Sequence, residues 1–313
     1  MYQSADDQTS MEESSSVDKH MTEQAAKQET MTTSQEEVRA RIGMVNYINT
    51  APLYEPWKRR GIDKSWRVEE APPAKLNKML AAGELDLGFV SCIEYGMHPC
   101  LYRILPDLSI SANGPVGSVF LFSKVPVKDL DGQMVLLSSQ SDTSVMLTKV
   151  VLEEFFGVHP KYVRGEVHGE YREACSALLA IGDDALRLVE EGSFACQLDL
   201  GEIWKEHTGL PFVFAVCAVR EEFCANHAEV LGDIYSCFLE CREEGRSRLK
   251  DICMIAAPRI PMEVADCYAY LRGIEYDLAA EKRAALEQFF SYLIKRGELD
   301  PAVLPLKIHV INR

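Results

Sequence analysis

The sequence lacks the features that mark several common classes of protein. No uncharged apolar run approaches the roughly 18 residues that a membrane-spanning helix needs. The motifs G-x-G-x-x-G, P-loop, H-E-x-x-H and G-x-S-x-G are absent. The histidines neither cluster nor pair with cysteine at the spacing of metal ligands. We therefore predict a protein that uses no metal and no cofactor.

Basic side chains are scarce beside acidic ones. The chain has 33 Lys and Arg against 48 Asp and Glu, which gives a formal net charge of −15. Such a surface repels nucleic-acid phosphates and anionic lipids. We expect a small-molecule partner, with no nucleic acid and no membrane; the sequence leaves the oligomeric state open.

The ten cysteines are scattered, several of them within apolar runs, and no C-x-x-C motif occurs. This pattern predicts buried free thiols in a reducing compartment rather than a disulfide framework.

Residues 1–40 contain no Leu, Ile or Phe, and carry nine acidic side chains against three basic ones. They cannot nucleate a core, and they lack the apolar stretch of a signal peptide. We predict a disordered acidic tail and a cytoplasmic protein.

From residue 41 onward, short apolar runs alternate with amphipathic stretches. Strands are predicted at 41–45, 85–91, 118–124, 133–139, 176–182 and 211–220, and helices between Pro72 and Gly83 and at 142–157, 183–192, 222–245, 262–272 and 277–296. The alternation favours an α/β fold with mainly parallel sheets. The closing helices have no strands of their own, so we expect them to pack back on the first sheet. The result is two lobes, joined by crossovers near 114–125 and 212–220.

Polar side chains follow most of the predicted strands, where ligands bind in such folds. They are Asn46, Asn49, Ser91, Glu94, Asn113, Ser118, Asp183, Asp184 and the hydroxyl-rich segment 138–144. Each type is also common in turns and helix caps, so singly each is a weak indication of ligand contact.

The segment SSQSDTS (138–144) is more informative because a helix needs only one cap, which Ser141 or Asp142 supplies. Thr143 and Ser144 then lie on the first turn, where free N–H groups and the helix dipole favour an anion. The strand-end loops hold few Lys or Arg. We predict a small carboxylate ligand held by neutral donors.

Several sequence blocks, in order, resemble the chorismate dehydratases, which begin the futalosine route to menaquinone. The blocks include VNYINTAPLY (45–54), AAGELDLGFVSCIEYG (81–96), ILPDLSISANGPVGSVFLFSKVPV (104–127), LDGQMVLLSSQSDTSV (130–145), ALLAIGDDAL (177–186) and DLGEIWKEHTGLPFVFAVCAVR (199–220). The resemblance implies the two-lobed fold of type II periplasmic binding proteins, with the ligand cleft between the lobes. With the crossovers above, it predicts a first lobe of residues 41–118 and 218–313 and a second lobe of residues 119–217.

The resemblance also implies an activity, the elimination of water from chorismate to give 3-[(1-carboxyvinyl)oxy]benzoate. It makes Asn49 and Ser118 the catalytic residues nearest the reacting ring. Thr143 and Ser144 would bind a carboxylate, and Ser91 and Asp183 would line the cleft.

Neither Asn49 nor Ser118 is a good base at neutral pH. We expect Asp183 to cap a helix, and we therefore expect the enolpyruvyl carboxylate of the substrate to accept the proton.

Two alternatives stay open at this point. The fold alone does not imply catalysis, so a non-catalytic cytoplasmic protein that binds a small carboxylate is possible. The related 1,4-dihydroxy-6-naphthoate synthase of the same route is the other, although NYINTAPL and GPVGS favour the dehydratase.

Overall fold

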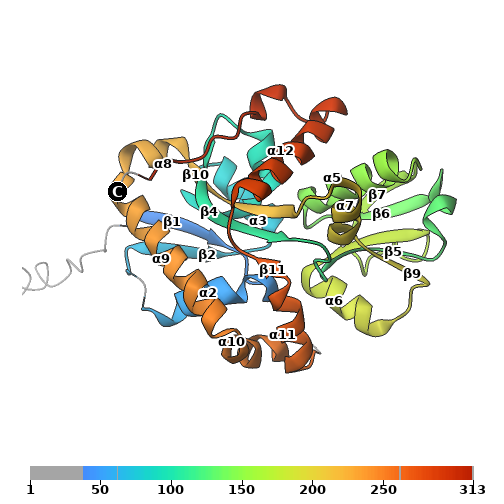
Figure 1. Ribbon diagram of the computed structural model, residues 1–313, viewed down its shortest axis with the longest axis horizontal. Helices are drawn as coiled ribbons and strands as arrows, with labels where there is room; N and C mark the ends of the chain where they lie inside the picture. Colours follow the sequence, from blue (N-terminus) through green and yellow to red (C-terminus); the bar gives the residue numbers. More distant parts are fainter. Residues whose placement is uncertain (1–37, 62, 261, 312–313) are drawn as a thin grey trace, which may run out of the picture. The chain divides into compact units, whose positions relative to one another are not determined.

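The computed structural model describes residues 38–61, 63–260 and 262–311, which form two β-sheets flanked by helices (Figure 1). The predicted tail 1–40 lies outside the described residues except for its last three, of which Ala40 already begins the first strand. Among the described residues, no helix combines the length and apolar character that crossing a bilayer requires.

The first sheet has six strands in the order β11-β4-β10-β3-β1-β2. Their bounds are β1 Ala40–Met44, β2 Trp66–Glu70, β3 Leu87–Ser91, β4 Tyr102–Ala112, β10 Phe212–Arg220 and β11 Ile274–Glu275. Strand β3 is buried along its whole length, as expected of a central strand covered on both faces.

The second sheet has five strands in the order β7-β6-β8-β5-β9. Their bounds are β5 Val119–Ser123, β6 Met134–Ser138, β7 Lys161–Gly165, β8 Ala177–Ile181 and β9 Cys196–Asp199. Helices α5, α6 and α7 lie around this sheet, at the right of Figure 1.

Helices connect and cover the strands. They are α2 Ala51–Arg59, α3 Pro73–Ala81, α4 Cys92–Met97, α5 Asp142–Lys149, α6 Gly182–Glu191, α7 Leu200–Thr208, α8 Glu221–Asn226, α9 Ala228–Ser247, α10 Leu249–Ala256, α11 Val264–Arg272 and α12 Ala280–Lys295. The single helix expected at 142–157 is α5 followed by a π-helical stretch, Val150–Phe155. Short 3₁₀ turns lie at Ile48–Thr50, Val127–Leu130, Ala257–Arg259 and Pro301–Val303.

The prediction of mainly parallel sheets is wrong, because both sheets are mixed. In the first sheet β1 runs parallel to β2 and β3, whereas β10 is antiparallel to β3 and β4. In the second sheet β5 is antiparallel to both of its neighbours. The chain enters the second sheet through β5 and returns to the first sheet through β10. Each of these two strands runs antiparallel to both of its neighbours. The closing segment also contributes a short strand, β11, which was not expected.

The chain passes from the first sheet to the second between β4 and β5 and returns between α7 and β10. Pairing with the first sheet begins at Phe212, so residues 212–217 pair there although the predicted division assigns them to the second lobe. The lobe boundaries themselves stay a prediction. We call the part built on the six-stranded sheet the first lobe and the part built on the five-stranded sheet the second lobe.

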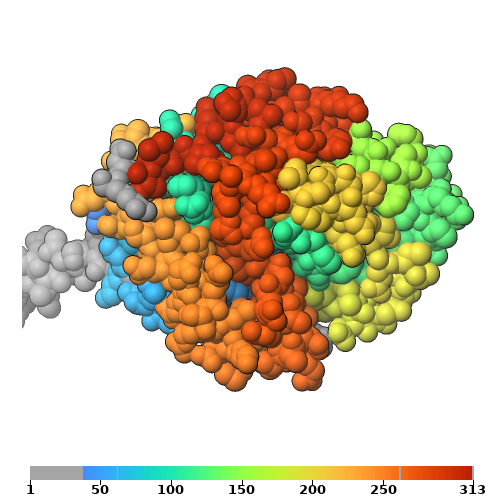
Figure 2. Space-filling view, viewed as in Figure 1, coloured from blue at the N-terminus to red at the C-terminus, as the bar shows by residue number. Residues whose placement is uncertain are grey.

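The closing helices pack back on the first sheet, as predicted. Helix α12 buries Phe289 against Phe212 of β10, with ring centroids 4.9 Å apart, and against Trp204 of α7 at 5.8 Å. Figure 2 shows this red segment lying beside the yellow atoms of α7. One helix therefore contacts elements of both lobes.

All ten cysteines are free, as predicted. Six of them are buried, but Cys100 is exposed, so the expectation of burial does not hold for every thiol.

Helices α2 and α9 pack at backbone distance, and one glycine permits this approach. A Cβ atom built on Gly245 of α9 would lie 1.7 Å from the carbonyl oxygen of Pro52 in α2. Gly232, on the same helix, has no atom within 4 Å of its would-be Cβ.

We predict opposite effects of alanine at these two glycines. Gly245→Ala forces the two helices apart and should lower the free energy of unfolding by about 1–3 kcal/mol or more. Gly232→Ala should raise it by roughly 0.5–1 kcal/mol, because alanine is the better helix former. Urea denaturation of both variants measures the difference. Equal stability of the two would contradict the close packing of α2 on α9.

Candidate functional site

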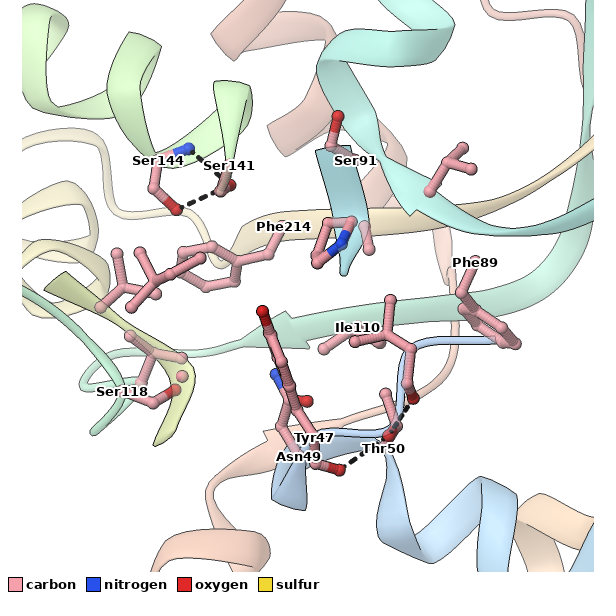
Figure 3. A pocket seen from close by; sticks show the side chains of 18 residues that line it. Tyr47, Asn49, Thr50, Phe89, Ser91, Ile110, Ser118, Ser141, Ser144 and Phe214 are labelled. Carbon is pink, nitrogen blue, oxygen red and sulfur yellow. Dashed lines mark hydrogen bonds between the residues drawn. The ribbon is translucent and has the colours of Figure 1, made fainter. Parts of the chain in front are cut away.

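A pocket of about 650 Å³, including its opening to solvent, is lined by residues of both lobes (Figure 3). Four of the six predicted site residues line it: Asn49, Ser91, Ser118 and Ser144. Asn49 and Ser91 come from the first lobe, Ser144 comes from the second, and Ser118 lies on the passage between them.

Four strand-to-helix junctions meet the wall of this pocket. Strand β1 leads into the turn Ile48–Thr50 and α2, β3 into α4, β6 into α5, and β8 into α6. Helices α5 and α6 have eight and ten residues, and Ser144 and Gly182 of their first turns line the pocket. The N–H of Ser144 is bound by Ser141 Oγ and that of Gly182 by the Ser118 carbonyl, so these helix starts favour an anion through their dipoles rather than through free N–H groups.

Asn49 presents an unpaired amide oxygen. Its backbone oxygen accepts a hydrogen bond from the Tyr276 hydroxyl at 2.8 Å, which holds the turn in place. Its side-chain Oδ1 is buried without a partner among the described residues. Buried polar atoms rarely stay unpaired in native proteins, so this atom indicates a place for a ligand.

Ser118 is held by the turn that precedes it. The backbone N–H groups of Val116 and Gly117 donate to the carboxylate of Asp199 at 3.0 and 2.6 Å. Asp199 also caps α7, accepting from Gly201 and Glu202. Burial raises the pKa of this carboxyl although four N–H groups bind it. Asp199 thereby fixes the position of Ser118 from the second lobe.

Ser91 is the N-cap of α4, and its hydroxyl proton is available as a hydrogen-bond donor. Its Oγ accepts hydrogen bonds from Asn77 Nδ2 at 2.9 Å and from the Glu94 N–H at 3.2 Å. With both acceptor positions used, the hydroxyl can only donate to a further partner. Among the described residues its proton has no acceptor, which suits an anionic ligand.

The N-cap of α5 is Ser141, the first of the two predicted candidates. Its Oγ accepts from the Ser144 N–H at 3.3 Å, and the two hydroxyl oxygens lie 3.2 Å apart (Figure 3). Asp142 instead pairs with Arg164 at 2.6 Å. Two adjacent hydroxyls therefore face the pocket at the start of α5.

The other two predicted site residues, Thr143 and Asp183, lie beside the pocket rather than in its wall. Thr143 Oγ1 accepts from the N–H of Ile93, at the start of α4, at 3.3 Å. Asp183 Oδ1 accepts from the N–H of Ile48 at 3.4 Å. Both are second-lobe side chains bound to the backbone of the first lobe.

The expectation that Asp183 caps its own helix is wrong. The N-cap of α6 is Ile181, and no side chain caps it. Burial raises the pKa of the Asp183 carboxyl above its ordinary value, which disfavours the ionised form in the folded state.

The described wall of the pocket contains no Asp, Glu, His, Lys, Arg or Cys side chain. Its one titratable group is Tyr47, whose pKa is raised to about 12 by burial and by the charges of Asp183 and Asp184. The phenol is therefore protonated at neutral pH. The wall offers neutral donors and apolar surface, and no ordinary general base.

Sequence reasoning missed several residues of this wall. Tyr47 lies in a segment whose composition indicates only a polar turn, and Phe89, Ile110 and Phe214 lie inside strands whose apolar residues are expected in the core. Neither composition nor periodicity distinguishes these four residues from ordinary turn and core residues.

Comparisons with known proteins show which family the sequence resembles. The menaquinone biosynthesis family matches residues 40–295. A chorismate dehydratase of Thermus thermophilus is 34% identical over 263 residues, which cover 79% of this chain and 93% of that protein. A chorismate dehydratase of Campylobacter jejuni is 32% identical over 178 residues, covering 55% and 64% of the two chains.

Solved structures share the fold at low sequence identity. A protein of Archaeoglobus fulgidus superposes with a TM-score of 0.70 at 17% identity, covering 82% of this chain and 97% of that one. The periplasmic aliphatic sulphonate binding protein of Escherichia coli gives 0.60 at 17% identity, covering 88% and 92%. These likenesses confirm the predicted periplasmic-binding-protein-like α/β fold. With the family match over residues 40–295, the chain belongs to the menaquinone biosynthesis family.

Proposed function

We propose that the protein is a chorismate dehydratase, a hydro-lyase that removes water from chorismate to give 3-[(1-carboxyvinyl)oxy]benzoate. The relative of 34% identity, aligned over 93% of its own length, carries that name. The observation that carries the proposal in the structure is a pocket to whose wall the described residues contribute no charged side chain, and where hydroxyls meet the starts of α5 and α6. Such a wall suits a small dicarboxylate.

In this proposal neutral donors bind the two carboxylates. The Ser144 hydroxyl at the start of α5 forms one anion site, supported by the helix dipole. Ser91, whose hydroxyl can only donate, is the nearest further donor in the first lobe. We assign Thr143 to contact between the lobes, because its hydroxyl already binds Ile93.

The reaction needs little machinery because its product is aromatic. A base takes the proton from the ring carbon that bears the enolpyruvyl ether, and the electron pair moves toward the ring carboxylate. The bond from the neighbouring ring carbon to the hydroxyl then breaks, and the hydroxyl leaves as water after taking up a proton. Donors around the ring carboxylate stabilise the charge that develops there.

We propose that the enolpyruvyl carboxylate of the substrate is the base. No described side chain in the pocket wall is a base at neutral pH, since the pKa of Tyr47 is about 12. Asn49 and Ser118 then orient the ring and donate to the departing hydroxyl. The buried Asn49 amide and the Ser118 turn fixed by Asp199 suit such a positioning task.

We further propose that the activity is cytoplasmic. Ten free thiols, six of them buried, suit a reducing compartment.

Incubation of the purified full chain with chorismate tests the function. The expected result is loss of chorismate and appearance of the enolpyruvyl benzoate by chromatography, without any added cofactor. Tight binding of chorismate with no turnover would contradict the proposal and favour a binding protein.

Variants of Asn49 and Asp183 separate positioning from base catalysis. Asn49→Ala should lower kcat on the order of a hundredfold with a small change in KM, because misplaced reacting groups cost about that much. Asp183→Asn should keep most of the activity, because the amide oxygen can still accept from Ile48.

Asp183→Asn should also leave stability at pH 7 unchanged or higher. The pKa of Asp183 is raised in the folded state, so its ionised form destabilises the fold above the ordinary carboxyl pKa, and asparagine removes that cost. A folded Asp183→Asn protein that binds chorismate normally but has no turnover would make Asp183 the base.

Ser144→Ala should weaken binding more than it slows chemistry. The variant loses one hydroxyl donor to a carboxylate, while the cap survives because Ser141 Oγ accepts from the backbone of residue 144. One such bond is worth about 1.5–3 kcal/mol, roughly a tenfold to hundredfold rise in Kd. Ser139→Ala, whose hydroxyl binds Glu166 outside the pocket, is the matched control. Equal affinity of both variants would remove Ser144 from the anion site.

A further inference from the structure

The first lobe reaches across the pocket to the second through Tyr47. This residue follows β1 and lines the pocket, and its hydroxyl donates to Gln140 Oε1 at 2.9 Å. Gln140 lies between β6 and α5, in the second lobe. Its Nε2 in turn donates to Asp184 of α6 at 3.3 Å, and Asp184 also accepts from Arg187 at 3.2 Å. The amide of Gln140 is thus oriented by its own lobe to accept from Tyr47.

The ring of Tyr47 also packs against the second lobe. It lies against Gly182, the first residue of α6, where a Cβ atom would stand 3.1 Å from Tyr47 Cδ2. Gly182 has φ +55°, a conformation that other residues rarely adopt. Both the shape of this helix start and the position of Gln140 therefore fit Tyr47.

Further hydrogen bonds join the lobes at the same junctions, and two of them have backbone donors. The N–H of Ile48 donates to Asp183, and the N–H of Ile93 donates to Thr143. Both donors lie at helix starts of the first lobe. If the lobes part, these two amides lose their partners together with Tyr47, so they report on separation of the lobes.

Three hydroxyl side chains of the pocket wall are buried in this arrangement. Ser118, Ser144 and Ser91 keep 1%, 2% and 4% of their surface exposed. A molecule with the ring and two carboxylates of chorismate cannot reach these hydroxyls from solvent unless the walls separate. Exchange of substrate and product then requires contacts between the lobes to break, and the bond from Tyr47 to Gln140 is one of them.

We propose that the hydrogen bond from Tyr47 to Gln140 is a latch that holds the two lobes closed over the bound ligand. Tyr47 and Gln140 are then positioning residues, which act on the reaction by setting the population of the closed state. The part of this inference that concerns chorismate rests on the proposed function. The closure itself depends only on contacts within the chain.

The first experiment needs no ligand. Tyr47→Phe keeps the ring on Gly182 and removes the hydroxyl, and Gln140→Leu removes the acceptor. Hydrogen–deuterium exchange of the segments around Ile48 and Ile93 should become roughly threefold to tenfold faster in either variant, the range expected for one neutral hydrogen bond. Combining both substitutions should add little to either one.

Tyr162→Phe is the matched control for this measurement. It also removes a phenol hydrogen bond, to Glu153 at 2.9 Å, but within the second lobe and away from the pocket. Its exchange around Ile48 and Ile93 should match that of the wild type. Unchanged exchange in Tyr47→Phe and Gln140→Leu, or a double variant in which their effects multiply fully, would overturn the latch.

The second experiment uses the enolpyruvyl benzoate product as the probe. Its Kd, measured by calorimetry, should rise about threefold to tenfold in Tyr47→Phe and in Gln140→Leu, with no further rise in the double variant. The exchange rates of wild type and variants can differ as expected while the wild type neither converts chorismate nor binds the product. That result would contradict the proposed function and leave the latch standing. If the wild type converts chorismate and binds the product, but Tyr47→Phe has the same exchange rates and the same Kd as the wild type, the result would contradict the latch alone.

Discussion

Strands of both sheets end at one cleft and turn into helices with almost no intervening chain, and the site depends on this constraint. Ser91 ends β3 and caps α4, and Ile181 ends β8 and precedes α6 directly. Short junctions leave N–H groups of first turns at the wall, together with the small polar residues that cap them. The same constraint brings side chains of one lobe within reach of backbone donors of the other, as Thr143 and Asp183 illustrate.

The proposed anion site follows from this arrangement, in which a chain of net charge −15 places no basic side chain in the pocket wall described. Helix starts and hydroxyls supply fixed partial charges, which need no reorganisation when charge develops on a substrate. An arginine would bind a carboxylate more strongly in the ground state. A wall of neutral donors can instead be arranged to favour the charge distribution of the transition state.

The sequence predicted much of the fold, and its failures have physical causes. Apolar runs marked β1, β3, β5, β6, β8 and β10, whereas β2, β4, β7, β9 and β11 were not predicted. Strand β4 was missed because Pro106 and Asp107 interrupt it, and Asp107 has φ 55°. The directions of the strands were not predicted either, because alternation along the chain does not reveal that the chain reaches β5 and β10 from the other sheet. Ser91, Ser118 and Ser144, which the sequence predicts at the cleft, line the pocket, and their roles there stay a prediction. Two contacts depend on how the two separate sheets meet, which the sequence does not reveal. They are the hydrogen bond between Thr143 and Ile93 and the hydrogen bond from Tyr47 to Gln140.

A crystal structure with the enolpyruvyl benzoate bound tests the central claim, that neutral donors at helix starts hold a dicarboxylate between the lobes. We predict one carboxylate within hydrogen-bond distance of Ser144 and the N–H groups at the start of α5, with the ring between Asn49 and Ser118. No Lys, Arg or His side chain should contact either carboxylate, and the hydrogen bond from Tyr47 to Gln140 should be present. A carboxylate paired with a basic side chain, or a ligand bound outside this pocket, would contradict the account.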